Sequence, residues 1–170
     1  MASLIDELID VLDKEEREYQ DLILLSQEKT PVIVKGDLEK LQRITEAEQI
    51  VIGKINKLEK KRTEVAKDIA LVLNKNEETL KVLDIVVLLE GQKEEQDRLL
   101  AVYEKLRETL KRMTTVNEMN KGLVNESLDF INYNLNLLKS VYQEPGTGNY
   151  TKNASNMTPI SGVGVFDAKQ

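Results

Sequence analysis

The chain has 170 residues, of which 41% are hydrophobic, 32% charged and only 4% aromatic, with a formal net charge of −6. It contains neither cysteine nor histidine, which excludes thiolate nucleophiles, disulfides, imidazole bases and Cys/His zinc sites and disfavours most classes of enzyme. Its eight glycines and three prolines are too few for the frequent turns of a strand-rich fold, so the composition predicts long helices.

The first periodic stretch begins at Leu4, where apolar residues start to recur at intervals of three and four, the spacing of one helix face. Thr30-Pro31 is the first place where this helix is expected to stop or kink, because proline lacks an N–H and disfavours helical geometry in the preceding residue. Gly36-Asp37 then predicts a helix end followed by a new N-cap, so we expect a turn there.

The second stretch keeps an average apolar spacing of 3.5, which predicts a heptad helix over residues 38–73, about 54 Å long. Its predicted packing face comprises Leu41, Ile44, Glu48, Val51, Ile55, Leu58, Arg62, Val65, Ile69 and Val72. Residues 1–30 hold nine acids and three bases, whereas residues 31–76 hold seven acids and ten bases. The acidic first helix is therefore expected to lie along the basic second one.

The most apolar stretch, residues 80–89, fits a strand or a buried helix by periodicity alone, and its helical neighbours favour a short helix. Gly91 separates it from a second long helix over residues 92–142, roughly 76 Å long. The predicted face of that helix comprises Leu99, Tyr103, Leu106, Leu110, Met113, Asn117, Asn120, Val124, Ser127, Ile131, Asn134, Leu138 and Val141.

The sequence thus predicts an all-α fold: an elongated antiparallel helical bundle or coiled coil of about three long helices with a short connecting helix. Residues 1–142 form its helical domain. Residues 143–170 are rich in Gly, Asn, Ser and Thr, with an apolar cluster only at Val163, Val165 and Phe166, and are expected to be a flexible C-terminal tail. No apolar run is long enough to span a bilayer and the N-terminus is acidic, so a cytoplasmic location without membrane insertion is expected.

Two charged clusters are candidate sites. Glu15, Glu16 and Glu18 could suggest a carboxylate metal centre, but such centres in helical bundles use Glu-x-x-His motifs, and a solvated acidic face is the better interpretation. The basic run from Lys54 to Arg62 contains interleaved acids and no aromatic residue, so an exposed helix flank is favoured over a nucleic-acid site. We therefore expect no catalytic residue, metal, cofactor or nucleic-acid partner.

The asparagine-rich stretch over residues 117–136 has two interpretations, which the sequence leaves open. Asparagines on a packing face fix the register of neighbouring helices at some expense of stability. Alternatively, the mixture of Asn with Leu, Val and Ile forms a surface that binds a partner helix yet stays soluble when empty.

The order of these parts resembles the FlgN family of bacterial flagellar export chaperones: an acidic first helix, the turn Gly36-Asp37-Leu38-Glu39, a long charged heptad helix, then NEMNKGLVNESLDFINYNLNLLKSVY and a Gly/Asn-rich tail. The resemblance covers essentially the whole chain. It implies a cytoplasmic, non-enzymatic chaperone that binds the C-terminal segment of the hook–filament junction proteins FlgK and FlgL, prevents their premature assembly and delivers them to the type III export gate.

The resemblance also implies site residues. The client-binding surface would be formed by Leu123, Val124, Leu128, Ile131, Leu135 and Leu138. Docking to the export-gate protein FlhA would use Tyr142 or, second, Tyr150, although the ring of Tyr142 could instead close the last helical turn. The competing interpretation is structural: a coiled-coil scaffold that self-associates, as a homodimer for example, through the same surface.

Overall fold

The structure is a computed structural model that describes residues 2–76 and 80–142. Within these residues the chain forms four helices and no strand: α1 (Ala2–Lys35), α2 (Leu38–Val72), α3 (Val82–Leu88) and α4 (Lys93–Tyr142). The predicted all-α fold, with three long helices and a short connecting helix, is confirmed. The expected tail, 143–170, lies outside the described residues.

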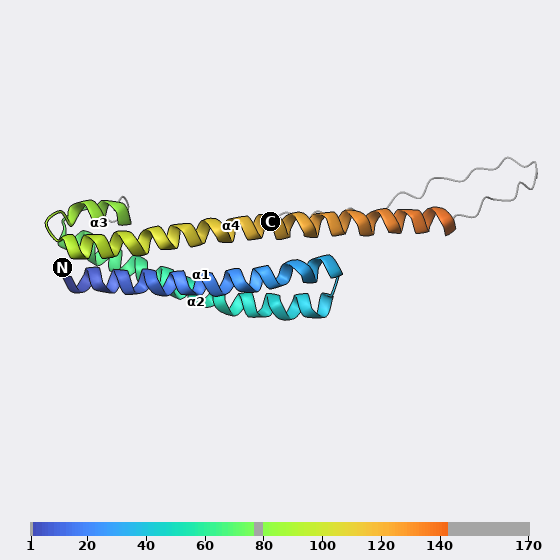
Figure 1. Cartoon of the computed structure of the whole chain (residues 1–170), viewed down its shortest axis with the longest axis horizontal. Coiled ribbons are helices and arrows are strands. Elements are labelled where there is room, and N and C mark those ends of the chain that lie inside the picture. The colour runs from blue at the N-terminus through green and yellow to red at the C-terminus, as the bar shows by residue number, and fades with distance from the viewer. Residues whose placement is uncertain (1, 77–79, 143–170) are drawn as a thin grey trace, which may run out of the picture.

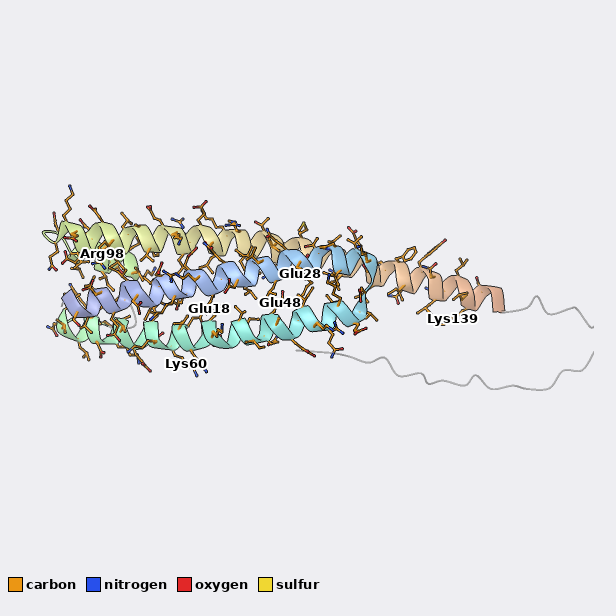
Figure 2. All side chains as sticks on the ribbon, turned by 60° about the horizontal axis from the view of Figure 1, so that its bottom comes forward. Glu18, Glu28, Glu48, Lys60, Arg98 and Lys139 are labelled. Atoms are coloured by element: carbon orange, nitrogen blue, oxygen red, sulfur yellow. The ribbon has the colours of Figure 1, made fainter. Side chains whose placement is uncertain are left out.

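Helix α1 is the centre of the bundle. It forms an antiparallel hairpin with α2, and α4 runs along its other side in the same direction as α1 (Figure 1). Figure 2 shows α1 lying between α4 and α2, and in the described part of the chain the backbones of α2 and α4 do not approach each other. The short α3 packs on the start of α4 and closes that end of the bundle.

The turn between α1 and α2 forms where the sequence predicts it. Gly36 has a φ of +68°, a left-handed conformation that glycine adopts without steric strain, and the carboxylate of Asp37 accepts a hydrogen bond of 3.0 Å from the backbone N–H of Lys40. Of the stop or kink expected at Thr30-Pro31, the stop is wrong, because α1 continues through Pro31 to Lys35. Burial of Val32 and Ile33 explains the extra turn, since it offsets the one backbone hydrogen bond that proline removes.

Two apolar clusters form the core. The larger lies at the α3 end and brings together Ile5, Leu8, Leu12, Val65, Ile69, Ile85, Val86, Leu89, Leu99, Val102 and Leu106. The smaller lies near the middle of α1 and contains Leu22, Ile23, Val51, Ile55 and Met113. Each large aliphatic side chain buried in this way contributes about 1.5–3 kcal/mol before ordering costs. Both clusters end well before the C-terminal third of α4, which contributes no residue to either cluster.

The buried faces of α2 and α4 have the predicted period, but not every predicted position is buried. On α2, the expected face is buried at Ile44, Glu48, Val51, Ile55, Val65 and Ile69, whereas Val72 is exposed. On α4, Leu99, Leu106, Met113 and Asn120 are buried as expected, but the alternate positions buried are Val102, Thr109 and Val116 instead of Tyr103, Leu110 and Asn117. Intervals of three-then-four and four-then-three both satisfy the heptad, and packing on α1 selects the first.

We predict that Ile69→Ala lowers the free energy of unfolding by about 2–5 kcal/mol, because it opens a cavity in the larger cluster, where Ile69 is fully buried. Leu71→Ala, two residues away but 75% exposed, is the matched control and should change stability by less than about 0.5 kcal/mol. Urea unfolding followed by circular dichroism measures both. Equal losses in the two variants would contradict the assigned face of α2.

Candidate functional site

Helix α4 is longer than the hairpin it packs against. The α1–α2 turn ends beside Leu123, Ser127 and Ile131, and α4 continues past it as a single helix (Figure 1). We define residues 128–142 as the free end of α4. At 1.5 Å per residue this segment is about 22 Å long. In Figure 2 the labelled Lys139 lies on it, beyond both α1 and α2.

The free end is rich in large apolar side chains that face solvent. Between 49% and 67% of each side chain is exposed in Leu128, Phe130, Ile131, Tyr133, Leu135, Leu137 and Leu138. By contrast, the α4 residues that face α1 are at most 8% exposed, as in Val102 and Val116. Contiguous apolar surface of this kind marks an interaction site in a folded protein.

The predicted client-binding residues fall together on this surface. Leu128, Ile131, Leu135 and Leu138 follow one another at intervals of three and four on the free end, and Val124, 38% exposed, continues the same line toward the bundle. Leu123 is half-buried against the α1–α2 turn. The side chain of Tyr142 and the whole of Tyr150 lie outside what the structure describes.

Three exposed residues of the same surface were not among those predicted: Phe130, Tyr133 and Leu137. Their spacing to one another, three and four residues, is the same helical signal that identified the first set. An apolar groove of about 430 Å³ joins this part of α4 to the end of α1, lined among others by Ile33, Leu123 and Phe130. The apolar surface therefore begins at the α1–α2 turn and includes more residues than the sequence predicted.

A buried polar network fixes α4 on α1 just before the free end begins. The side-chain amide of Asn120 donates to the backbone oxygen of Ser26 at 2.7 Å and accepts from the hydroxyl of Thr30 at 2.7 Å. The hydroxyl of Ser26 donates to Glu48 of α2 at 2.8 Å, and Lys29 pairs with the same carboxylate. Asn120 therefore has the role that the register interpretation assigns to a seam asparagine, whereas Asn117 is exposed.

The acidic residues of α1 are not the solvated face that the sequence suggested. Glu15 and Glu16 are fully buried. Glu15 pairs with Arg62 of α2 at 3.0 Å, and Glu16 pairs with Lys105 of α4 at 2.9 Å. The prediction was wrong because both partners are remote in sequence, so the cluster of acids alone could not show that α1 carries its charges into two interfaces.

The surroundings of Glu15 and Glu16 shift the pKa values of the two carboxyl groups in opposite directions. Burial raises the pKa of Glu15, and the nearby Arg62 only partly counteracts this. Burial also acts to raise the pKa of Glu16, but hydrogen bonds from Lys105, Thr109 and Gln20 outweigh it, so the pKa of Glu16 is lowered overall. Glu16 is therefore the one whose ionised form stabilises the fold.

Other charges also contribute to the pairing of α1 with α2. Lys54 of the basic run lies 3.5 Å from Glu18, and Lys61 of the same run lies 2.6 Å from Glu7, which confirms that the acidic first helix lies along the basic second one.

Within residues 2–76 and 80–142 no three acidic side chains are grouped as metal ligands would be. No helix of that described part carries an apolar stretch able to span a bilayer.

We predict that Glu16→Gln lowers the free energy of unfolding at pH 7 by about 1–3 kcal/mol, because it removes the charge that Lys105 and Thr109 bind. The folded pKa of Glu16 is lowered, so its contribution is present above the unfolded pKa and is lost as pH falls through the folded value. The difference between wild type and variant should shrink below pH 4.5.

The exposed Glu28, 4.0 Å from Lys40, provides the control for this prediction. Glu28→Gln should change the free energy of unfolding by about 0.5 kcal/mol or less at both pH 7 and pH 4. Urea titrations at pH 7 and pH 4 measure all three proteins. A Glu16→Gln variant as stable as wild type at pH 7 would contradict a stabilising role for the buried carboxylate.

Comparison with known proteins identifies the family of this chain. Residues 1–158 match the FlgN protein family. The chain is also 30% identical over 152 residues, 89% of each protein, to YvyG of Bacillus subtilis (strain 168), which is described as an uncharacterized protein. No solved structure matches it. As the order of its helices suggested, the chain belongs to the FlgN family, a family of flagellar export chaperones.

Proposed function

We propose that this protein is a cytoplasmic chaperone of the hook–filament junction proteins FlgK and FlgL. It binds their C-terminal helical segments on the free end of α4, prevents their premature assembly and delivers them to the export gate. The observation that carries the proposal is the apolar surface of α4 beyond the α1–α2 turn, where no other part of the described chain covers it. Membership of the FlgN family supports the same role.

The physical reason is the burial of apolar surface on both partners. A client segment that forms an amphipathic helix exposes a face that aggregates until it is covered. Laying that face on α4 would bury side chains such as Leu128, Ile131 and Leu135, which are about half exposed in the free chaperone. Each large side chain removed from water contributes up to about 1.5–3 kcal/mol before the costs of association and ordering.

We predict that Leu128→Asp and Ile131→Asp each weaken client binding at least about tenfold, because a charge on the surface would have to be desolvated for the client to dock. The helical circular dichroism should be unchanged, since neither side chain is in the core. Leu24→Asp, 63% exposed but on α1, is the matched control and should bind as wild type. Titration calorimetry with purified FlgK and FlgL gives the affinities.

Two results would contradict the proposal. Wild-type protein that binds neither FlgK nor FlgL at micromolar concentrations would remove the client assignment. A stable dimer in sedimentation experiments, lost in Leu128→Asp and without affinity for either junction protein, would instead favour the self-associating scaffold. Loss of helicity in the variants would show that the surface belongs to a core.

Export-gate docking is proposed for Tyr142, with Tyr150 as the second candidate. Tyr142 is the last residue of α4, so a partner that docks at this end of the helix would bind beside the client surface. We predict that Tyr142→Ala weakens binding of the client-loaded complex to the cytoplasmic part of FlhA at least about tenfold and leaves client affinity unchanged. Surface plasmon resonance with immobilised FlhA measures it.

Tyr150→Ala serves as the comparison for this prediction. If Tyr150→Ala shows the loss and Tyr142→Ala does not, the docking residue is Tyr150. If neither variant weakens FlhA binding, and Tyr142→Ala instead loses helicity, the ring of Tyr142 closes the last turn of α4 and docking lies elsewhere.

A further inference from the structure

The apolar surface of the free end consists of two stripes. The first stripe comprises Val124, Leu128, Ile131, Leu135 and Leu138. The second stripe comprises Leu123, Phe130, Tyr133 and Leu137. With 3.6 residues per turn, the two stripes lie about 135° apart around α4. The end of α1 touches residues of both stripes in the groove that Phe130 and Ile131 line, but one helix cannot bury both stripes along their length.

Two polar residues, Ser127 and Asn134, lie between the stripes. The hydroxyl of Ser127 donates to the backbone oxygen of Leu123 at 2.8 Å, and the amide of Asn134 donates to that of Phe130 at 2.9 Å. Both of these hydrogen bonds lie within α4 itself, so a partner that covers the polar line has to pair only the second N–H and the oxygen of the Asn134 amide. The polar line separates the stripes but does not prevent docking on either side of it.

The bundle itself shows how much of α4 a single helix covers. Along α1, the buried α4 residues form one line of alternating three- and four-residue steps: Leu99, Val102, Leu106, Thr109, Met113, Val116 and Asn120. Seven-residue steps back from Leu128 in the first stripe lead to Lys121 and Thr114, which are polar and exposed. The same steps back from Val124 lead to Asn117 and Leu110, both exposed, and to the half-buried Tyr103, so the first stripe extends a line of α4 that α1 does not bury.

The second stripe continues the interface with α1. Seven-residue steps from the buried Val116 lead to Leu123, Phe130 and Leu137, so this line runs from beneath α1 onto the free end. The groove at the end of α1, which Ile33 and Gly36 line with Phe130, would receive the end of a helix placed in continuation of α1. The first stripe continues no buried line of α4 and therefore requires a second neighbour.

We infer that the free end of α4 holds two helices of one client chain, one helix on each stripe. This inference rests on the proposed chaperone function and specifies its partner: a segment of two consecutive amphipathic helices. One of them takes the position along α4 that α1 leaves at Gly36, and the other packs on the first stripe. The free end of α4 then lies between the two client helices, as α1 lies between α2 and α4 in the chaperone itself.

Three adjacent residues provide the test. Leu135 of the first stripe and Leu137 of the second are 49% and 50% exposed, and Asn136 between them lies on the polar side of the helix. In the full chain, Leu135→Asp and Leu137→Asp should each weaken binding of full-length FlgK or FlgL at least about tenfold, whereas Asn136→Asp should stay within about twofold of wild type. Light scattering should give one client per chaperone.

The outcomes separate the inference from the function on which it rests. If Leu135→Asp is impaired and Leu137→Asp binds as wild type, the client is a single helix and the inference fails while the chaperone proposal stands. Two clients per chaperone would also overturn it. If wild type binds neither junction protein, both fail.

A measurement on the wild-type chain guards against misfolded variants. Leucine methyl resonances of Leu135 and Leu137 should both shift when FlgK or FlgL is added to saturation, because both side chains become buried. A shift at Leu135 alone would show that the second stripe stays in water and would overturn the inference.

Discussion

The difference in length between two parallel helices determines the rest of this structure. Helix α1 has 34 residues and α4 has 50, and the pair is aligned near its start, where Asp6 of α1 pairs with Arg98 of α4 at 2.9 Å. The surplus of α4 must therefore emerge at the other end, beyond the α1–α2 turn. Leu123, Phe130 and Leu137, which continue the line of α4 that α1 buries, would be core beside a longer α1.

The alignment is held by polar contacts more than by the apolar clusters. An aliphatic interface tolerates a shift of one heptad, whereas a shift of α1 along α4 would leave Asn120 and Glu16 buried without their partners. Such unsatisfied groups cost about 1–3 kcal/mol each. The buried polar residues thus fix where α1 ends relative to α4, and through this the extent of the exposed surface.

Periodicity and the Gly36-Asp37 turn were sufficient to predict the helices, because heptad spacing and capping are local properties of the chain. The burial of Glu15 and Glu16, and the choice of Val102 over Tyr103, depend on neighbours remote in sequence and could not be predicted. The apolar line through Leu128 and the other predicted client residues was visible, but the sequence left open whether a neighbouring helix buries it. Exposure depends on which face of α4 the other helices pack against and on where they end, which no local pattern records.

The free end is preorganised for its role. A helix of about fifteen residues is marginal alone in water because nucleation is unfavourable, but this one extends a helix that the bundle has already nucleated. Lys139 in the last turn adds a favourable interaction with the negative end of the helix dipole. A client therefore meets a surface whose backbone is already ordered, and the entropy of ordering falls on the client alone.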